Sequence, residues 1–158
     1  LNIIRSVPFI ILLVVLMPVT VLITGTSLGI KGVIPPLVIG TSPFFARLVE
    51  TALHEVDRGI VEASQAMGAT LPQIIFRVLL PEALPGLIAA VTVTAIVLMD
   101  YTAMSGAIGG GGIGDLAIRY GYQRFQTDVM VVTVLILILI VQAIQATGNR
   151  LVTHYSRK

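Results

Sequence analysis

The residues that could perform catalysis or bind a metal are few and widely separated in this sequence. It contains no cysteine, and its two histidines, His54 and His154, lie in different halves of the chain. A thiolate nucleophile and a thiolate metal site are therefore excluded, and two distant histidines are a poor basis for a metal cluster. Ser105 as nucleophile, with either histidine as its base, is the remaining catalytic hypothesis, a membrane-embedded hydrolase.

A run of glycines from Gly109 to Gly114 (GGGGIG) has the composition of a phosphate-binding loop. Such loops follow a strand and end in Lys-Ser or Lys-Thr, and the sequence has neither feature here. The glycines favour instead a tight turn that packs closely. Tyr120, Tyr122 and Phe125 follow the run and are typical of residues at a membrane interface.

Asp100 is a carboxylate that directly follows an apolar run. An acid at membrane depth is costly enough to be a functional candidate, for example as a proton carrier. The other interpretation is that Asp100 lies at the outer end of its helix and is hydrated. The sequence alone leaves both interpretations open.

The composition indicates what kind of element must position these residues. Of 158 residues, 56% are hydrophobic and only 11% are charged, and the mean hydropathy is +0.98. An ordinary soluble domain has about 25% charged residues, so this chain is expected to lie in a membrane. Its net charge of +2 comes from scattered Lys and Arg, which argues against a nucleic-acid partner.

Charge-poor stretches predict an all-α transmembrane fold, because a spanning helix needs roughly 20 apolar residues. Four spans are expected, at about residues 7–23, 33–54, 83–101 and 129–146. Pro18 predicts a kink in the first span. The second span is the weakest, because Lys31 and Arg47 bracket a short apolar run, and it crosses only if Arg47 reaches the interface and the helix continues toward His54.

The basic residues predict the orientation of these spans. Seven of the ten lie at the N-terminus, in the segment from Arg47 to Glu82, or at the C-terminus: Arg5, Arg47, Arg58, Arg77, Arg150, Arg157 and Lys158. By the positive-inside rule these regions are cytoplasmic, which places the Gly-rich segment 105–128 outside as a loop. The hydrolase hypothesis then fails, since Ser105 and the histidines face opposite sides.

The segment 55–82 lies between the second and third spans and has clear helix punctuation. Asp57 is expected to cap a helix that Gly68 ends in a left-handed conformation. Thr70 caps a second short helix, with Pro72 in its first turn and Pro81 at its end. The segment is therefore predicted to form a helix, a glycine elbow and a second helix.

The first of these helices has a shallow apolar face. Ile60, Ala63, Ala66 and Met67 share one side at helical spacing, while Glu62 and Gln65 lie off it. A face of this kind suits docking into a groove on another protein. The alternative, a helix lying on lipid, usually carries Lys and Arg on its polar side and larger anchors such as Trp or Phe.

These residues also carry a family resemblance. Glu62-Ala63-Ser64, then Gly68, then Val78-Leu79-Leu80-Pro81 resemble the EAA signature of bacterial ABC importer permeases, with Ser64 replacing an Ala and Val78 an Ile. The similarity extends over nearly the whole chain to methionine-import permeases, for example in RSVPFIILLVVLMP, VLLPEALPGL and YTAMSGAIGGGGIG. Those permeases have five spans with the N-terminus outside, so the resemblance implies that this chain lacks their first span.

The resemblance implies a type I importer core in the bacterial inner membrane, with residues 1–158 forming one multi-pass permease domain. Expected partners are two ABC ATPase subunits, a second copy of the permease and an external solute-binding lipoprotein. ATP is used by the ATPase, so no cofactor or enzymatic activity is expected of this chain. The alternative is a proton-coupled secondary transporter that uses Asp100.

The resemblance also implies two groups of functional residues. The coupling residues on segment 55–82 are Glu62, Ala63, Ser64, Ala66, Met67, Gly68, Ala69, Leu80 and Pro81. Met104 resembles the position at which the family narrows its pathway, and a flexible Met can obstruct or yield there. Asp100, Tyr101 and Thr102 are candidates beside it, although ordinary helix packing is the alternative role for this stretch.

Overall fold

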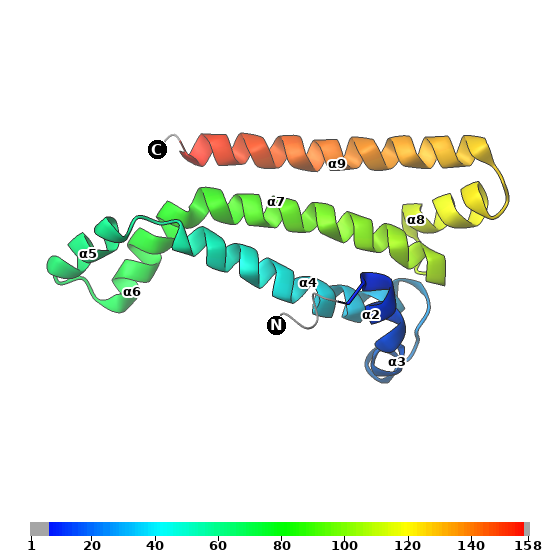
Figure 1. Cartoon of the computed structure of the whole chain (residues 1–158), viewed down its shortest axis with the longest axis horizontal. Coiled ribbons are helices and arrows are strands. Elements are labelled where there is room, and N and C mark those ends of the chain that lie inside the picture. Colours follow the sequence, from blue (N-terminus) through cyan, green and yellow to red (C-terminus); the bar gives the residue numbers. More distant parts are fainter. Residues whose placement is uncertain (1–6, 157–158) are drawn as a thin grey trace.

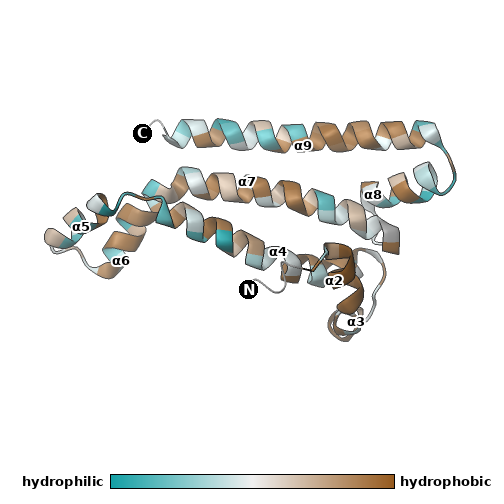
Figure 2. Cartoon of the chain, viewed as in Figure 1, coloured by the Kyte–Doolittle hydropathy of each residue, from teal (hydrophilic) through white to brown (hydrophobic). Residues whose placement is uncertain are grey.

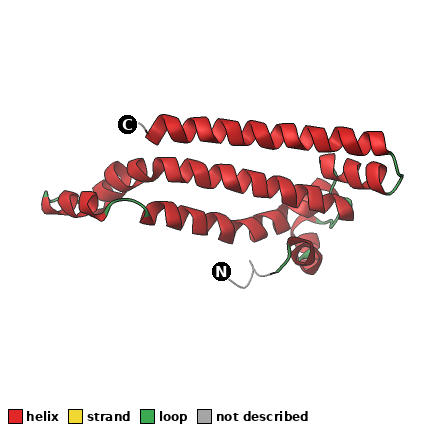
Figure 3. Cartoon of the chain, turned by 45° about the horizontal axis from the view of Figure 1, so that its top comes forward, coloured by secondary structure: helices red, strands yellow, loops and turns green. Residues whose placement is uncertain are grey.

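The computed structural model describes residues 7–156, and all regular structure in this range is helical (Figures 1 and 3). The α-helices are α2 (Phe9–Val15), α3 (Met17–Thr24), α4 (Gly29–His54), α5 (Arg58–Ala66), α6 (Leu71–Ile74), α7 (Leu80–Ser105), α8 (Gly112–Leu116) and α9 (Thr127–Ser156). Two π-helical segments, η1 (Ile75–Leu79) and η3 (Ala117–Tyr122), and the 3-10 turn η2 (Gly106–Ile108) connect some of them. The predicted all-helical class is confirmed. Arg5, Arg157 and Lys158, which entered the orientation argument, lie outside the described range.

Helix α7 is the centre of the molecule, with α4 on one side and α9 on the other (Figure 1). Small residues let the helices approach closely. A Cβ on Gly86 of α7 would lie 2.8 Å from the Ala52 Cβ of α4, and a Cβ on Gly148 of α9 would overlap the Thr92 side chain of α7. Close approach through small residues is how helices associate in a membrane, where no hydrophobic effect drives them together.

Within residues 7–156, three helices are long and apolar enough to cross a membrane: Gly29–His54, Leu71–Ser105 and Thr127–Ser156. Figure 2 shows hydrophobic residues along the part of α9 that follows its first turn and hydrophilic residues toward its C-terminal end. The segment expected to be the weakest span forms one helix that runs on to His54. Its Arg47 is half-exposed and pairs with Glu50 at 2.8 Å.

The expected span over residues 7–23 is not one continuous helix. The chain forms the short helices α2 and α3, which meet at Leu16. Pro18 explains the break, because it has no N–H to donate to the Val14 carbonyl and its ring would clash with that group. A kink was predicted here, but the interruption is large enough that neither piece has the length of a span.

The segment 105–128, expected to be a loop, is largely helical. After α7 the chain turns through η2 and through Gly109, Gly111 and Gly112, which all have positive φ, and then forms α8 and η3. A Cβ on Gly114 would lie 2.6 Å from the Ala103 carbonyl oxygen at the end of α7. The glycines therefore serve close packing as well as turning, which is why a glycine-rich segment can be ordered and helical.

Pro81 does not end a helix, contrary to expectation. Helical structure continues from Leu71 through η1 into α7, and Pro81 lies in the first turn of α7. In η1 the Leu80 N–H donates to the Ile75 carbonyl, five residues back. We attribute this wider turn to Pro81, whose ring would collide with the Arg77 carbonyl in a regular α-helix.

Candidate functional site

The two short helices of segment 55–82 are held by the local signals expected from the sequence. The Asp57 side chain accepts a hydrogen bond of 2.8 Å from the Gly59 N–H and caps α5. Gly68 follows α5 with a φ of +80°, and the Thr70 N–H then donates to the Gln73 side chain at 2.9 Å. These bonds fix a helix, a left-handed elbow and a second helix with little help from the rest of the chain.

Helix α5 has one buried side and one free apolar side. Ser64 is buried, and its hydroxyl donates to the Ile60 carbonyl at 2.8 Å. Ile60, Ala63, Ala66 and Met67 are all exposed, and Met67 is 82% exposed. We call these four residues the α5 face. Glu62 and Gln65 are exposed on other sides of the helix.

The other coupling candidates lie where this segment joins the rest of the chain. Ala69 is half-buried after the elbow, while Leu80 and Pro81 begin α7 just after the π-helical η1. They are not part of the α5 face. Ala69 lies in the connection between α5 and α6, whereas Leu80 and Pro81 lie in the helix that continues from α6 through η1 into α7.

The four pathway candidates lie at the opposite end of α7, so the structure does not bring the two groups together. Asp100, Thr102 and Met104 are exposed. The Tyr101 ring stacks on Phe9 of α2, with ring centroids 4.2 Å apart and planes within 2°. This stack attaches α2 to the end of α7 and was not foreseen from the sequence.

The same end of α7 holds a cluster of glycines with close backbone contacts. Gly106, Gly110 and Gly114 are spaced four apart, and a Cβ on each would lie under 3 Å from another part of the backbone or from Ser105. The Gly109 carbonyl also accepts a hydrogen bond of 3.2 Å from the Gly29 N–H at the start of α4. The three glycines do not share a helical face, since Gly106 lies in η2, Gly110 in the turn and Gly114 in α8.

Ser105 is buried near this glycine cluster, and its hydroxyl donates to the Thr102 carbonyl at 2.7 Å. His54 ends α4 at the other end of α7, beside the Ala52–Gly86 contact. Ser105 is 19 residues from Gly86, about 28 Å along the helix. The geometry therefore excludes a hydrogen bond between Ser105 and His54.

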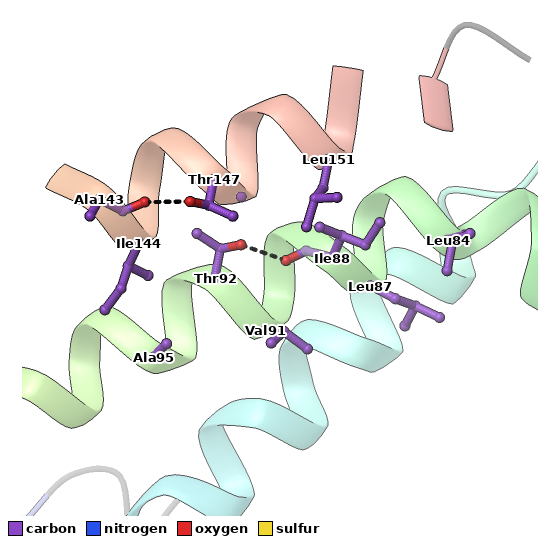
Figure 4. Close-up of a pocket in the computed structure, with 11 residues that line it drawn as sticks. Leu84, Leu87, Ile88, Val91, Thr92, Ala95, Ala143, Ile144, Thr147 and Leu151 are labelled. Atoms are coloured by element: carbon purple, nitrogen blue, oxygen red, sulfur yellow. Dashed lines mark hydrogen bonds between the residues drawn. The ribbon is translucent and has the colours of Figure 1, made fainter. Parts of the chain in front are cut away.

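A groove of about 620 Å³ between α7 and α9 offers no free polar group (Figure 4). Its lining is apolar apart from Thr92 and Thr147. The Thr92 hydroxyl donates to the Ile88 carbonyl at 2.8 Å, and the Thr147 hydroxyl donates to the Ala143 carbonyl at 2.7 Å. Because both hydroxyls are satisfied within their own helices, the groove is unsuited to a charged or zwitterionic solute.

The family model described as "Binding-protein-dependent transport system inner membrane component" matches residues 1–158. The chain belongs to this family. It is an inner-membrane component of a binding-protein-dependent transport system, which makes the helical fold described above a transmembrane one and confirms the family assignment made from the EAA-like motif.

Named relatives of this inner-membrane component are similar over most of its length. It is 56% identical over 157 residues to the probable D-methionine transport system permease protein MetI of Vibrio cholerae, covering 99% of this chain and 70% of that protein. It is 51% identical over 148 residues to the methionine import system permease protein MetP of Bacillus subtilis, covering 94% of this chain and 67% of that protein. A solved structure of the MetNI methionine ABC transporter in inward-facing conformations superposes with a TM-score of 0.93 at 51% identity, covering 98% of this chain and 71% of that one.

Proposed function

We propose that this chain is the permease subunit of an ATP-binding cassette importer that takes up methionine or a related amino acid. The observation that carries the proposal is the α5 face, an exposed apolar surface that the Gly68 elbow connects to the helix Leu71–Ser105, which is long and apolar enough to span a membrane. A docked ATPase that moves α5 would also move α7, because α5 packs against α6 and η1, and helical structure is unbroken from there to Ser105. The names of the relatives supply the substrate class.

The proposed partners follow from the same surfaces. Two ABC ATPase subunits would receive the α5 faces of two copies of this chain, and they would bind and hydrolyse ATP. This chain itself binds no cofactor in the proposal. A solute-binding lipoprotein would deliver the amino acid at the other end, near α8 and η3.

In the proposed orientation α5, α6 and the C-terminal end of α9 are cytoplasmic, and the turn after η3 is external. We expect single cysteines introduced at Thr70 and Ser156 to react with a membrane-impermeant maleimide only from the cytoplasmic side. A cysteine at Gln123 should react only from outside. All three positions are exposed and the chain has no native cysteine, so labelling reports sidedness directly. Labelling of Thr70 from outside in intact cells would end the docking proposal.

Energy supply distinguishes an ATP-driven importer from a proton-coupled carrier that uses Asp100. Uptake into vesicles should stop when ATP is depleted while the proton gradient is clamped, and it should survive Asp100→Asn with a change of less than about threefold. Asp100 is exposed on α7, as a hydrated carboxylate would be. Uptake that persists without ATP and is lost in Asp100→Asn would instead establish the proton-coupled alternative.

A further inference from the structure

The turn that joins η3 to α9 presents aromatic side chains to the surroundings. Phe125 is 87% exposed and Tyr122 is 69% exposed. The Arg124 guanidinium lies over the Tyr120 ring, 4.5 Å from its centroid. We call Tyr122, Arg124 and Phe125 the turn cluster.

Phe125 is held in this exposed position by the backbone conformation of the turn. Phe125 has a φ of 55°, and it is the one non-glycine residue with positive φ in the part of the chain that the structure describes. This conformation is rare for a bulky residue. Two hydrogen bonds close the turn, from the Phe125 N–H to the Tyr122 carbonyl at 3.4 Å and from the Gln126 N–H to the Tyr120 carbonyl at 3.3 Å. The turn is also anchored by Gly121, where an added Cβ would lie 3.0 Å from the Met130 Cβ of α9.

The position of the turn just before α9 determines its depth in the membrane. Phe125 precedes the first residue of α9, Thr127, by two positions, and the charge-free run of the span begins at Val129. That run continues to Asn149, roughly 20 residues, which matches the hydrocarbon thickness of a bilayer. The turn cluster therefore lies just beyond the hydrocarbon, at the level of the lipid headgroups.

We propose that the turn cluster is a lipid-binding anchor that inserts Tyr122 and Phe125 into the headgroup region of the adjacent leaflet. In the charge-free run of α9 that follows the cluster, Val131, Val132, Leu135 and Leu139 are exposed. Aromatic rings are favoured at this depth, and the positive charge of Arg124 suits lipid phosphates. The anchor fixes the depth of α9 and, through the Gly121–Met130 contact, of α8 and η3. It involves no solute or ATPase and is independent of the proposed substrate.

The absence of tryptophan from this chain allows a direct test, because one introduced residue is the only source of indole fluorescence. Phe125→Trp is placed in the full chain in vesicles of phosphatidylcholine and phosphatidylglycerol. The lipids carry bromine either near the acyl carbonyl or near the chain end, and iodide serves as an aqueous quencher. Leu139→Trp, at a 67% exposed position within the α9 span, is the deep reference, and Gln65→Trp on α5 is the aqueous reference.

We expect shallow bromines to quench Phe125→Trp at least twofold more than deep bromines, and iodide to quench it weakly. Leu139→Trp should show the reverse bromine order, and Gln65→Trp should respond to iodide alone. Quenching of Phe125→Trp by iodide alone would overturn the proposal. So would protection of this residue only after a solute-binding protein is added, since the turn would then be a protein-docking surface. If Phe125→Trp fails to fold, Tyr122→Trp carries the same expectations.

Discussion

Gly68→Arg is expected to insert normally and to reduce transport more than tenfold. An ideal Cβ at Gly68 meets no atom of this chain within 4 Å, so the arginine disturbs no internal packing. It would, however, place a long charged side chain next to the α5 face. A buried, unpaired charge at an interface costs several kcal/mol, and about 1.4 kcal/mol corresponds to a factor of ten in affinity. The measurements are co-purification of the ATPase and substrate uptake per ATP hydrolysed.

Three further variants separate the effect of the introduced charge from that of backbone strain at Gly68. Gly68→Ala has the same unfavourable positive φ without the charge, so it isolates backbone strain, which costs about 1 kcal/mol. Ala66→Arg puts the charge on the α5 face and should match Gly68→Arg. Gln65→Arg changes an exposed residue away from that face and should be tolerated. If both arginine variants on the docking side co-purify with the ATPase and import at the normal rate, the α5 face is not the coupling surface.

Gly114→Ala should destabilise the packing of α8 against α7 by about 3 kcal/mol, the upper part of the range for overpacking. The added methyl would meet the backbone of Ala103, including its carbonyl oxygen at 2.6 Å, and backbone cannot rotate away. Thermal unfolding in detergent measures the loss, and transport should fall with it.

Gly40→Ala is the matched control for this prediction. Its Cβ would approach the end of the Leu12 side chain at 3.1 Å, and a side-chain end can move. Alanine also favours a helix over glycine by about 1 kcal/mol. We therefore expect Gly40→Ala to be neutral or mildly stabilising. Equal effects of the two substitutions would contradict the close packing of Gly114 against α7.

Local sequence signals were sufficient for the segment around α5. Asp57, Gly68 and Thr70 act on residues only two or three positions away, so their roles can be read without knowing the rest of the fold. The exposure of the α5 face followed from helical spacing alone. The burial of Ser64 did not, because it depends on how α5 packs against η1 and α6.

Proline and glycine were harder to interpret, because each allows several outcomes that only the surroundings decide. Pro18 breaks a helix, whereas Pro81 is accommodated by a widened turn within a continuous one. The glycines between 105 and 115 suggested a loop, but they permit backbone contact between η2, α8 and α7. Such contacts join segments whose relative placement could not be inferred from composition.

The unbroken helical stretch from Leu71 to Ser105 gives the molecule a mechanical property. Its 35 residues make a rod about 52 Å long. If one end of that rod turns by about 5°, the other end moves through roughly 4.5 Å by simple geometry, about the rise of three helical residues. Asp100 and Met104 occupy the far end of this lever. The wide turn at Ile75–Leu79 lies close to the end that joins α6 and α5, where bending would reduce this displacement. The stiffness of those five residues would therefore influence how much of a movement of α5 reaches Asp100 and Met104.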